Sequence, residues 1–231
     1  MKNISERLFD KINNAMIDQN PSDNFFIEDI FPSLIYSEII ARLPTDNLYN
    51  FIDHPDAVLP DGTKTRKLLD LTDETISRFN KDDQNFWKIL KDFLISTELQ
   101  NIILKKFHEK ITDRFGNNWP EMVTVPILYR DFPGYQIGIH TDAPYKIATM
   151  QFYFPRDRSQ IHLGTSFHEK QQDQFRLIKT NPFKPNSAYA FARTETSWHS
   201  VKQIAKHEAI RDSLALTIYE KNHEYKSKKY E

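Results

Sequence analysis

The sequence predicts a mainly β fold with helices in its N-terminal half, which places it in the α+β class. Apolar residues recur with a helical period through most of residues 1–118, and the period changes to the two of β-strands from residue 119 to residue 220. Several short strands separated by turn signals are typical of a barrel or a sandwich. Helices that precede such strands are expected to pack on an outer face of the sheet.

The first half begins with a predicted helix, a predicted strand and a second helix. The first helix rests on an apolar stripe at every fourth residue, formed by Ile4, Leu8, Ile12 and Met16. An apolar run from Phe25 to Phe31 predicts a short strand, and Pro32 suits the first turn of a helix that Pro44 ends. Residues 44–70 are rich in Pro, Asp and Asn and predict a loop with one short strand.

The helical period returns between residues 73 and 114. Residues 97–100, Thr-Glu-Leu-Gln, fit a capping box that opens a further helix at Thr97, and Gly116 follows the last apolar position. The second half alternates between apolar and polar residues from Val123 onward. Its predicted strands are rich in β-branched and aromatic residues and cover 147–154, 175–178, 188–191 and 214–219.

Composition limits the class of protein. Lys and Arg number 31 and Asp and Glu 32, so the net charge of −1 gives no reason to expect a nucleic-acid partner. The absence of cysteine excludes a disulfide scaffold, a thiolate zinc site and a cysteine nucleophile. Glycines number five, and no phosphate-binding glycine motif occurs. Since no apolar run approaches about 18 residues, we expect no membrane span and a cytoplasmic location.

The organisation expected from these patterns is a single domain over residues 1–231. Residues 1–118 form a mostly helical support region, residues 119–220 form the β core that carries the chemistry, and residues 221–231 form a solvated basic tail with four lysines.

Histidines supply the candidate metal ligands. Of the eight, two stand in His-x-Asp pairs, at His54 and at His140. His54 lies in the proline-rich loop, where an exposed histidine is the ordinary case. His140 and Asp142 follow a strand pattern, and in extended chain their side chains project to the same side and can reach one metal. A facial iron site needs two histidines and one carboxylate, and His199 is the candidate for the second histidine.

Twelve residues after His199 comes Arg211, in a predicted strand whose other face is aliphatic. Alternation places Arg211 and Ser213 on one face of residues 211–219 and the aliphatic residues on the other. Burying an unpaired guanidinium is costly, and its planar fork beside a hydroxyl suits a carboxylate bound by two hydrogen bonds. Taken one at a time, His199 also fits a buried barrel histidine and Arg211 a structural ion pair.

These residues together resemble the Fe(II)- and 2-oxoglutarate-dependent dioxygenases, in particular their prolyl-hydroxylase-like branch. The resemblance covers roughly residues 120–220 and rests on His140-x-Asp142, His199 and Arg211-x-Ser213, in that order. The segments around them are also similar to that branch. They are Leu128–Gly134, Ile139–Asp142, Ile147–Pro155, Ala190–Phe191 and Ser197–Val201, with Phe25–Pro32 resembling the start of such enzymes.

The resemblance implies a double-stranded β-helix, or jelly roll, with iron held by His140, Asp142 and His199. It implies that 2-oxoglutarate chelates the iron and places its far carboxylate on Arg211 and Ser213, with Tyr153 in a position where relatives often contact the cosubstrate. Phe132 stands where some relatives have another such tyrosine. Trp198, next to His199, is expected to be a packing residue.

The implied activity is hydroxylation of an unactivated carbon with O2, releasing succinate and CO2. Relatives that halogenate lack the carboxylate that Asp142 supplies, and Thr217 stands where nucleic-acid demethylases carry a second arginine. The alternatives are a cupin-like isomerase or sugar-binding module that does not use 2-oxoglutarate, and a barrel that only binds a partner. We expect a small-molecule or sugar-like substrate.

Cationic side chains flank the motif strands, and they allow two interpretations. Together at the mouth of the site they would favour an anionic substrate, whereas as solvated loop charges they would not. They are Lys146, Arg156, Arg158 and Arg193. His162 and His168, near Gly164, are open to a similar pair of interpretations, as substrate contacts or as ordinary surface and core residues.

Overall fold

Two antiparallel sheets form the framework of the protein in a computed structural model that describes residues 2–221 and 223. The larger sheet has seven strands in the order β1-β9-β6-β11-β4-β3-β2, and the smaller has four in the order β5-β10-β7-β8. The strands of the larger sheet are β1 (Asn24–Glu28), β2 (Asn50–Phe51), β3 (Arg66–Asp70), β4 (Met122–Asp131), β6 (Lys146–Tyr153), β9 (Ser187–Ala192) and β11 (Arg211–Glu220). Those of the smaller sheet are β5 (Ile137–His140), β7 (Thr165–Gln171), β8 (Gln174–Thr180) and β10 (His199–Val201).

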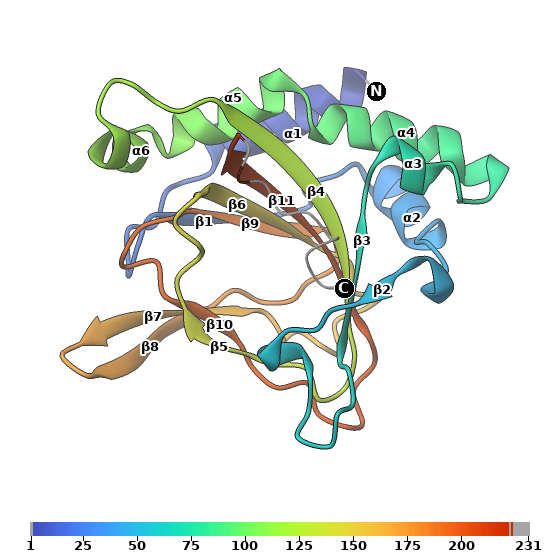
Figure 1. The fold of residues 1–231 in the computed structure, drawn as a ribbon. Helices are drawn as coiled ribbons and strands as arrows, with labels where there is room; N and C mark the ends of the chain where they lie inside the picture. The colour runs from blue at the N-terminus through green and yellow to red at the C-terminus, as the bar shows by residue number, and fades with distance from the viewer. Residues whose placement is uncertain (1, 222, 224–231) are drawn as a thin grey trace.

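Helices cover one face of the larger sheet, and the smaller sheet faces its other side (Figure 1). The helices are α1 (Lys2–Asn14), α2 (Ser33–Ala41), α3 (Asp73–Ile76), α4 (Lys81–Leu94), α5 (Thr97–Lys106) and α6 (His108–Phe115), with short 3-10 turns η1 (Asp46–Leu48) and η2 (Pro55–Ala57). Their apolar sides, including Leu8, Trp87 and Ile103, form one buried cluster with the outer face of the sheet.

Alternation along β11 separates this outer cluster from the space between the sheets. Leu214, Leu216 and Ile218 belong to the outer cluster, as the sequence predicts. Arg211 and Ser213 have the opposite orientation, towards a second and more aromatic cluster. That inner cluster contains Tyr135, Tyr153, Phe167, Phe183, Tyr189 and Phe191, with smaller apolar residues between them. The polar candidates therefore lie between the sheets.

Two expectations about helix ends are wrong. The first helix ends at Asn14, and Met16 lies beyond it with 89% of its surface exposed, because the bridge between Asp18 and Asn24 takes the chain into a turn. The second concerns the capping box. The capping side chain of α5 is Ser96, whose Oγ accepts the Leu99 N–H at 3.3 Å, so the cap lies one residue before Thr97.

The segments with the weakest sequence pattern contain strands. Residues 44–70 form two strands, β2 and β3, rather than one, and β3 pairs with β4 inside the larger sheet. Residues 1–118 therefore supply three strands of that sheet in addition to helices. β7 lies in the segment after Pro155, where no strand is predicted before Phe175. The predicted basic tail, residues 221–231, falls outside the described residues except at 221 and 223.

No helix among the described residues is long and apolar enough to cross a membrane.

Gly164 permits two backbone segments to approach closely beside the inner cluster. A Cβ added to Gly164 would lie 1.6 Å from the carbonyl oxygen of Asn181. The neighbouring Leu163 carbonyl accepts a hydrogen bond from Arg211 Nε at 2.9 Å. The close approach therefore helps to place the acceptor that fixes the arginine.

We expect Gly164→Ala to lower the free energy of unfolding by about 3 kcal/mol or more, because backbone atoms must move to admit the methyl group. Gly138→Ala is the matched control, since no atom lies within 4 Å of its added Cβ. Chemical denaturation of both variants measures the difference, and equal stabilities would contradict the role assigned to the close approach.

Candidate metal centre

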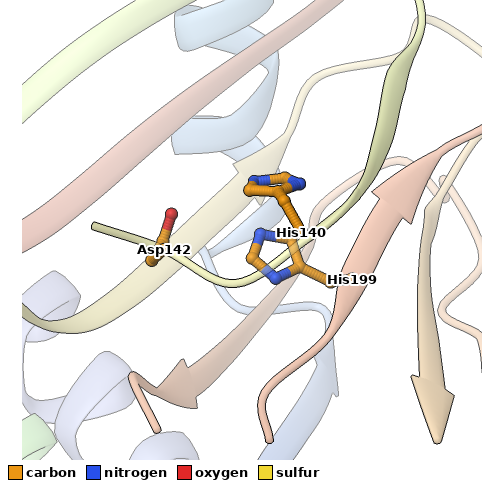
Figure 2. Close-up of side chains that lie close together, drawn as sticks. All are labelled: His140, Asp142 and His199. Atoms are coloured by element: carbon orange, nitrogen blue, oxygen red, sulfur yellow. The ribbon is translucent and has the colours of Figure 1, made fainter. Parts of the chain in front are cut away.

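Three predicted ligands come together between the sheets. His140 ends β5, Asp142 follows it, and His199 begins β10, which pairs with β5 so that the two histidines are direct partners across the strands. One ligand atom from each residue lies within 4.8 Å of the others, and Figure 2 shows the three side chains converging. This is the one group of three or more possible ligands found in the described part of the chain.

Backbone carbonyls fix the tautomer of both histidines. His140 Nδ1 lies 2.9 Å from the carbonyl oxygen of Gly138, and His199 Nδ1 lies 2.9 Å from that of Ser197. Because a carbonyl oxygen only accepts, each Nδ1 carries a proton, and in the neutral form of each ring Nε2 is the atom with a lone pair for a metal. Such outer hydrogen bonds orient histidines that bind metals.

The Asp142 carboxylate is held at both oxygens. Lys146 Nζ lies 2.6 Å from Oδ1, and Thr149 Oγ1 donates to Oδ2 at 3.0 Å. Burial by itself raises the pKa of Asp142, but the Lys146 ammonium and the two neighbouring imidazoles outweigh it and lower that pKa below its usual range. The carboxylate is therefore ionised at neutral pH, as a metal ligand must be.

Burial lowers the pKa of His199 to about 4, since the ring has little solvent to stabilise its charged form. His199 is thus neutral at pH 7, and no proton competes for its Nε2. Its ring contacts the rings of Phe191, at 4.6 Å between centroids, and of Phe167, at 6.4 Å.

Arg211 lies in a row of charged residues across three strands. Arg66 on β3 and Arg211 on β11 are both register partners of Asp131 on β4. Arg211 Nη1 donates to Asp131 Oδ2 at 2.7 Å, and Arg66 Nε lies 3.0 Å from Asp131 Oδ1. The third nitrogen of the Arg211 guanidinium, Nη2, is buried and has no hydrogen-bond partner in the part of the chain that the structure describes. One donor of a fully buried cation is therefore available to an anion.

Ser213 stands at the end of a buried chain of hydrogen bonds. The Tyr153 hydroxyl donates to Thr165, Thr165 to Tyr189 and Tyr189 to Gln151, and Gln151 Nε2 then donates to Ser213 Oγ at 2.9 Å. Burial raises the pKa of both tyrosines, so they stay protonated donors. In this direction of donation, no described residue accepts the Ser213 proton, and it is a second donor available beside Arg211.

Sequence reasoning assigned no role in the site to Asp131, Arg66, Gln151 or Tyr189. Alternation could have indicated that Tyr129 and Asp131 share a face, but only strand pairing brings Arg66 opposite Asp131. Phe132, which the sequence singles out, contacts Phe51 at 6.2 Å between ring centroids and is absent from the inner cluster. Two tyrosines on either side of it, Tyr129 and Tyr135, contribute to that cluster instead.

The remaining candidates have other partners. His54 pairs with Asp56 at 3.5 Å in its exposed loop, His162 with Glu208 at 2.8 Å, and His168 contacts Ser200 Oγ at 2.8 Å. Trp198 packs against Phe175, with ring centroids 4.9 Å apart.

Two of the four cations near the motif strands are paired with carboxylates. Lys146 is bound to Asp142, and Arg193 Nη1 donates to Glu195. Arg156 and Arg158 are exposed. The cations therefore do not form one uncompensated basic mouth.

A cavity of about 500 Å³ adjoins the segment that carries Asp142. It lies between α6, the loop before β1 and the loop from β9 to β10. Two arginines of its lining bond to the ligand segment, because Arg193 Nε donates to the Asp142 carbonyl at 3.2 Å and Arg114 Nη1 to the Lys146 carbonyl at 2.6 Å. The cavity is thus connected to the candidate metal centre through these two arginines, and none of the three candidate ligands lines it.

The buried His199 makes the stability of the metal-free protein depend on pH. Its pKa is about 4 in the fold against an ordinary value of 6.5, so the unfolded chain binds more protons between these values. The stabilisation is present above about pH 6.5 and is lost as the pH falls towards 4, by up to about 3 kcal/mol. We expect His199→Gln to flatten this slope in chemical denaturation, whereas the matched His54→Gln should keep it. An unchanged slope in His199→Gln would contradict the prediction.

Comparison with known proteins gives structural matches only. No protein-family model matches the chain, and no curated protein matches it. A prolyl hydroxylase from Trichoplax adhaerens, in complex with a peptide fragment of hypoxia inducible factor, is similar with a TM-score of 0.56 and 15% identity, over 95% of this chain and 92% of that one. A prolyl-4-hydroxylase from Pseudomonas putida has a TM-score of 0.51 and 10% identity, over 95% and 100% of the two chains.

A non-haem carbocyclase dependent on alpha ketoglutarate (2-oxoglutarate), SnoK from nogalamycin biosynthesis, is similar with a TM-score of 0.54 and 7% identity, over 85% and 79% of the chains. At these identities the likeness establishes architecture, and the chain has the fold shared by prolyl hydroxylases and other non-haem oxygenases that use 2-oxoglutarate.

Proposed function

We propose that the protein is a non-haem Fe(II)- and 2-oxoglutarate-dependent oxygenase whose two sheets form a jelly roll. The observation that carries this proposal is the convergence of two imidazoles and one ionised carboxylate within 4.8 Å, between the sheets. Two histidines and a carboxylate on one face of a metal leave further positions open, as in the oxygenases of this type. The shared fold supports the same assignment.

The residues near Arg211 fit the far carboxylate of 2-oxoglutarate. Arg211 Nη2 and the Ser213 hydroxyl are both donors without an acceptor among the described residues. An unfilled donor on a buried guanidinium costs free energy, and a carboxylate that accepts from both groups removes that cost. A sugar-binding module has no need for this pair, which is why we favour the oxygenase.

Each part of the site has a separate task under this proposal. His140 and His199 offer their Nε2 atoms to the iron, and Asp142 offers an oxygen while Lys146 and Thr149 keep its carboxylate in place. Arg211 and Ser213 orient the cosubstrate, and Tyr153 holds Thr165 at the start of the hydrogen-bond chain. Bound iron and 2-oxoglutarate, with O2, supply an oxidant able to take a hydrogen atom from an unactivated carbon, with succinate and CO2 as coproducts.

The reaction we propose is hydroxylation of a small-molecule or sugar-like substrate. Asp142 keeps the carboxylate ligand that halogenating relatives lack. Structures with this fold include a carbocyclase and an epimerase as well as hydroxylases, so the fold alone does not select hydroxylation. The cavity lined by Arg193 is large enough for a small substrate, and its support as the substrate site is the bond from Arg193 to the Asp142 carbonyl.

Anaerobic absorbance tests the proposal. We expect purified protein with Fe(II) to develop a visible charge-transfer band when 2-oxoglutarate is added, because chelation joins the cosubstrate to the metal. His199→Ala should abolish the band, and Arg211→Ala should weaken 2-oxoglutarate binding about a hundredfold or more, since it removes charge-assisted hydrogen bonds. His54→Ala, at the other His-x-Asp pair, is the control and should behave as the wild type.

The other outcomes separate the alternatives. Metal binding without a band would favour the cupin-like isomerase or sugar-binding module. Neither metal nor band would favour a barrel that only binds a partner.

Ser213→Ala should raise the dissociation constant of 2-oxoglutarate about tenfold, because one donor to a charged group is lost while the guanidinium remains. Its affinity for Fe(II) should not change. Ser166→Ala, whose hydroxyl bonds Thr180 in the smaller sheet, is the matched control. Titration of the absorbance band compares the three proteins, and equal affinity in Ser213→Ala would remove Ser213 from the cosubstrate site.

A further inference from the structure

Asp131 alone would cancel the positive charge of the Arg211 guanidinium. Its carboxylate is fully buried and is 2.7 Å from Arg211 Nη1, and only 1% of the Arg211 side chain is exposed. An isolated Arg211–Asp131 pair would have no net charge. A neutral pair attracts an incoming carboxylate much less than a free guanidinium does.

Arg66 supplies that second cation. It approaches Asp131 from the opposite side, on β3, with Nε 3.0 Å from Oδ1. The row of Arg66, Asp131 and Arg211 therefore has a net charge of +1 in a region with little solvent. With Asp131 shared between two guanidiniums, Arg211 keeps enough positive charge to bind an anion through its free Nη2.

The position of Arg66 is fixed by contacts other than the ion pair. Its guanidinium lies 3.9 Å from the ring centroid of Tyr129 and 4.6 Å from that of Tyr135, and it donates to the Tyr135 hydroxyl. Two aromatic faces and one hydroxyl thus hold it against Asp131. Arg66 has no such contact with the three metal ligands.

We propose that Arg66 is a positioning residue of the anion site, one that acts through Asp131 to keep Arg211 available for the far carboxylate of the cosubstrate. The inference rests on the proposed function, because it assigns the anion to 2-oxoglutarate. It gives a role to an arginine that lies far from the motif residues in the sequence and in a segment that shows no motif of its own.

A charge-cancelling pair of substitutions tests this role. Arg66→Gln leaves Asp131 to neutralise Arg211, so the dissociation constant of 2-oxoglutarate should rise about tenfold or more. The double variant Arg66→Gln with Asp131→Asn restores the net charge of +1 and should bring that constant back to within about threefold of the wild type. Arg130→Gln is the matched control. Arg130 is the neighbour of Asp131 on β4, and it bonds Asp212 instead.

The measurement is anaerobic titration of the Fe(II)-loaded protein with 2-oxoglutarate, followed by the charge-transfer band. Fe(II) affinity, followed by tryptophan fluorescence, is expected to stay constant in all variants and shows that the metal centre is intact. A merely structural role for Arg66 predicts that the double variant binds 2-oxoglutarate no better than Arg66→Gln, and this result would overturn the inference. Unchanged affinity in Arg66→Gln would overturn it as well.

Failure of the proposed function has a different signature. A wild-type protein that binds Fe(II) but gives no band with 2-oxoglutarate would refute the oxygenase assignment before any Arg66 variant is measured.

Discussion

The Asp131 carboxylate, bound on both sides by guanidinium groups, sets the arrangement of the protein's interior. Arg66, Asp131 and Arg211 come from β3, β4 and β11, and they meet only because these strands pair in one register. A slip of one residue would turn each side chain to the face covered by helices and leave charges without partners. The ion pairs therefore couple the registers of β3, β4 and β11. The register between β11 and β6 in turn places Ser213 opposite Tyr153.

The polar interior is stable because apolar burial is concentrated on the opposite face of the larger sheet. Leu214, Leu216 and Ile218 pack against the helices, whereas the residues between them face the smaller sheet. The helices thus provide much of the hydrophobic stabilisation, and the space between the sheets can hold ions, hydroxyls and aromatic rings. Many of those groups bond one another, and the donors that Arg211 and Ser213 leave free are the ones that the proposed ligand would use.

Local sequence patterns predicted much of the site, because they specify which face a side chain occupies. The spacing of His140 and Asp142 and the alternation around Arg211 depend on neighbours two residues away, and the structure keeps both. Arg66 and Asp131 could not be found in this way, since their meeting depends on pairing between strands 65 residues apart in sequence. The prediction that placed Met16 in the first helix was wrong, because a stripe of apolar residues does not show where a turn ends the helix.

The place of β3 in the larger sheet has a consequence for engineering the protein. The resemblance to known oxygenases begins near residue 120, which invites the idea of a minimal catalytic fragment that starts there. Such a fragment would contain all three candidate metal ligands, but it would lack Arg66 and the Arg114 guanidinium that bonds the Lys146 carbonyl. It would also leave the outer edge of β4 without its partner strand. The smallest autonomous unit is therefore expected to be much longer than the motif-bearing region, and transplanting residues 120–220 alone would yield an aggregation-prone fragment.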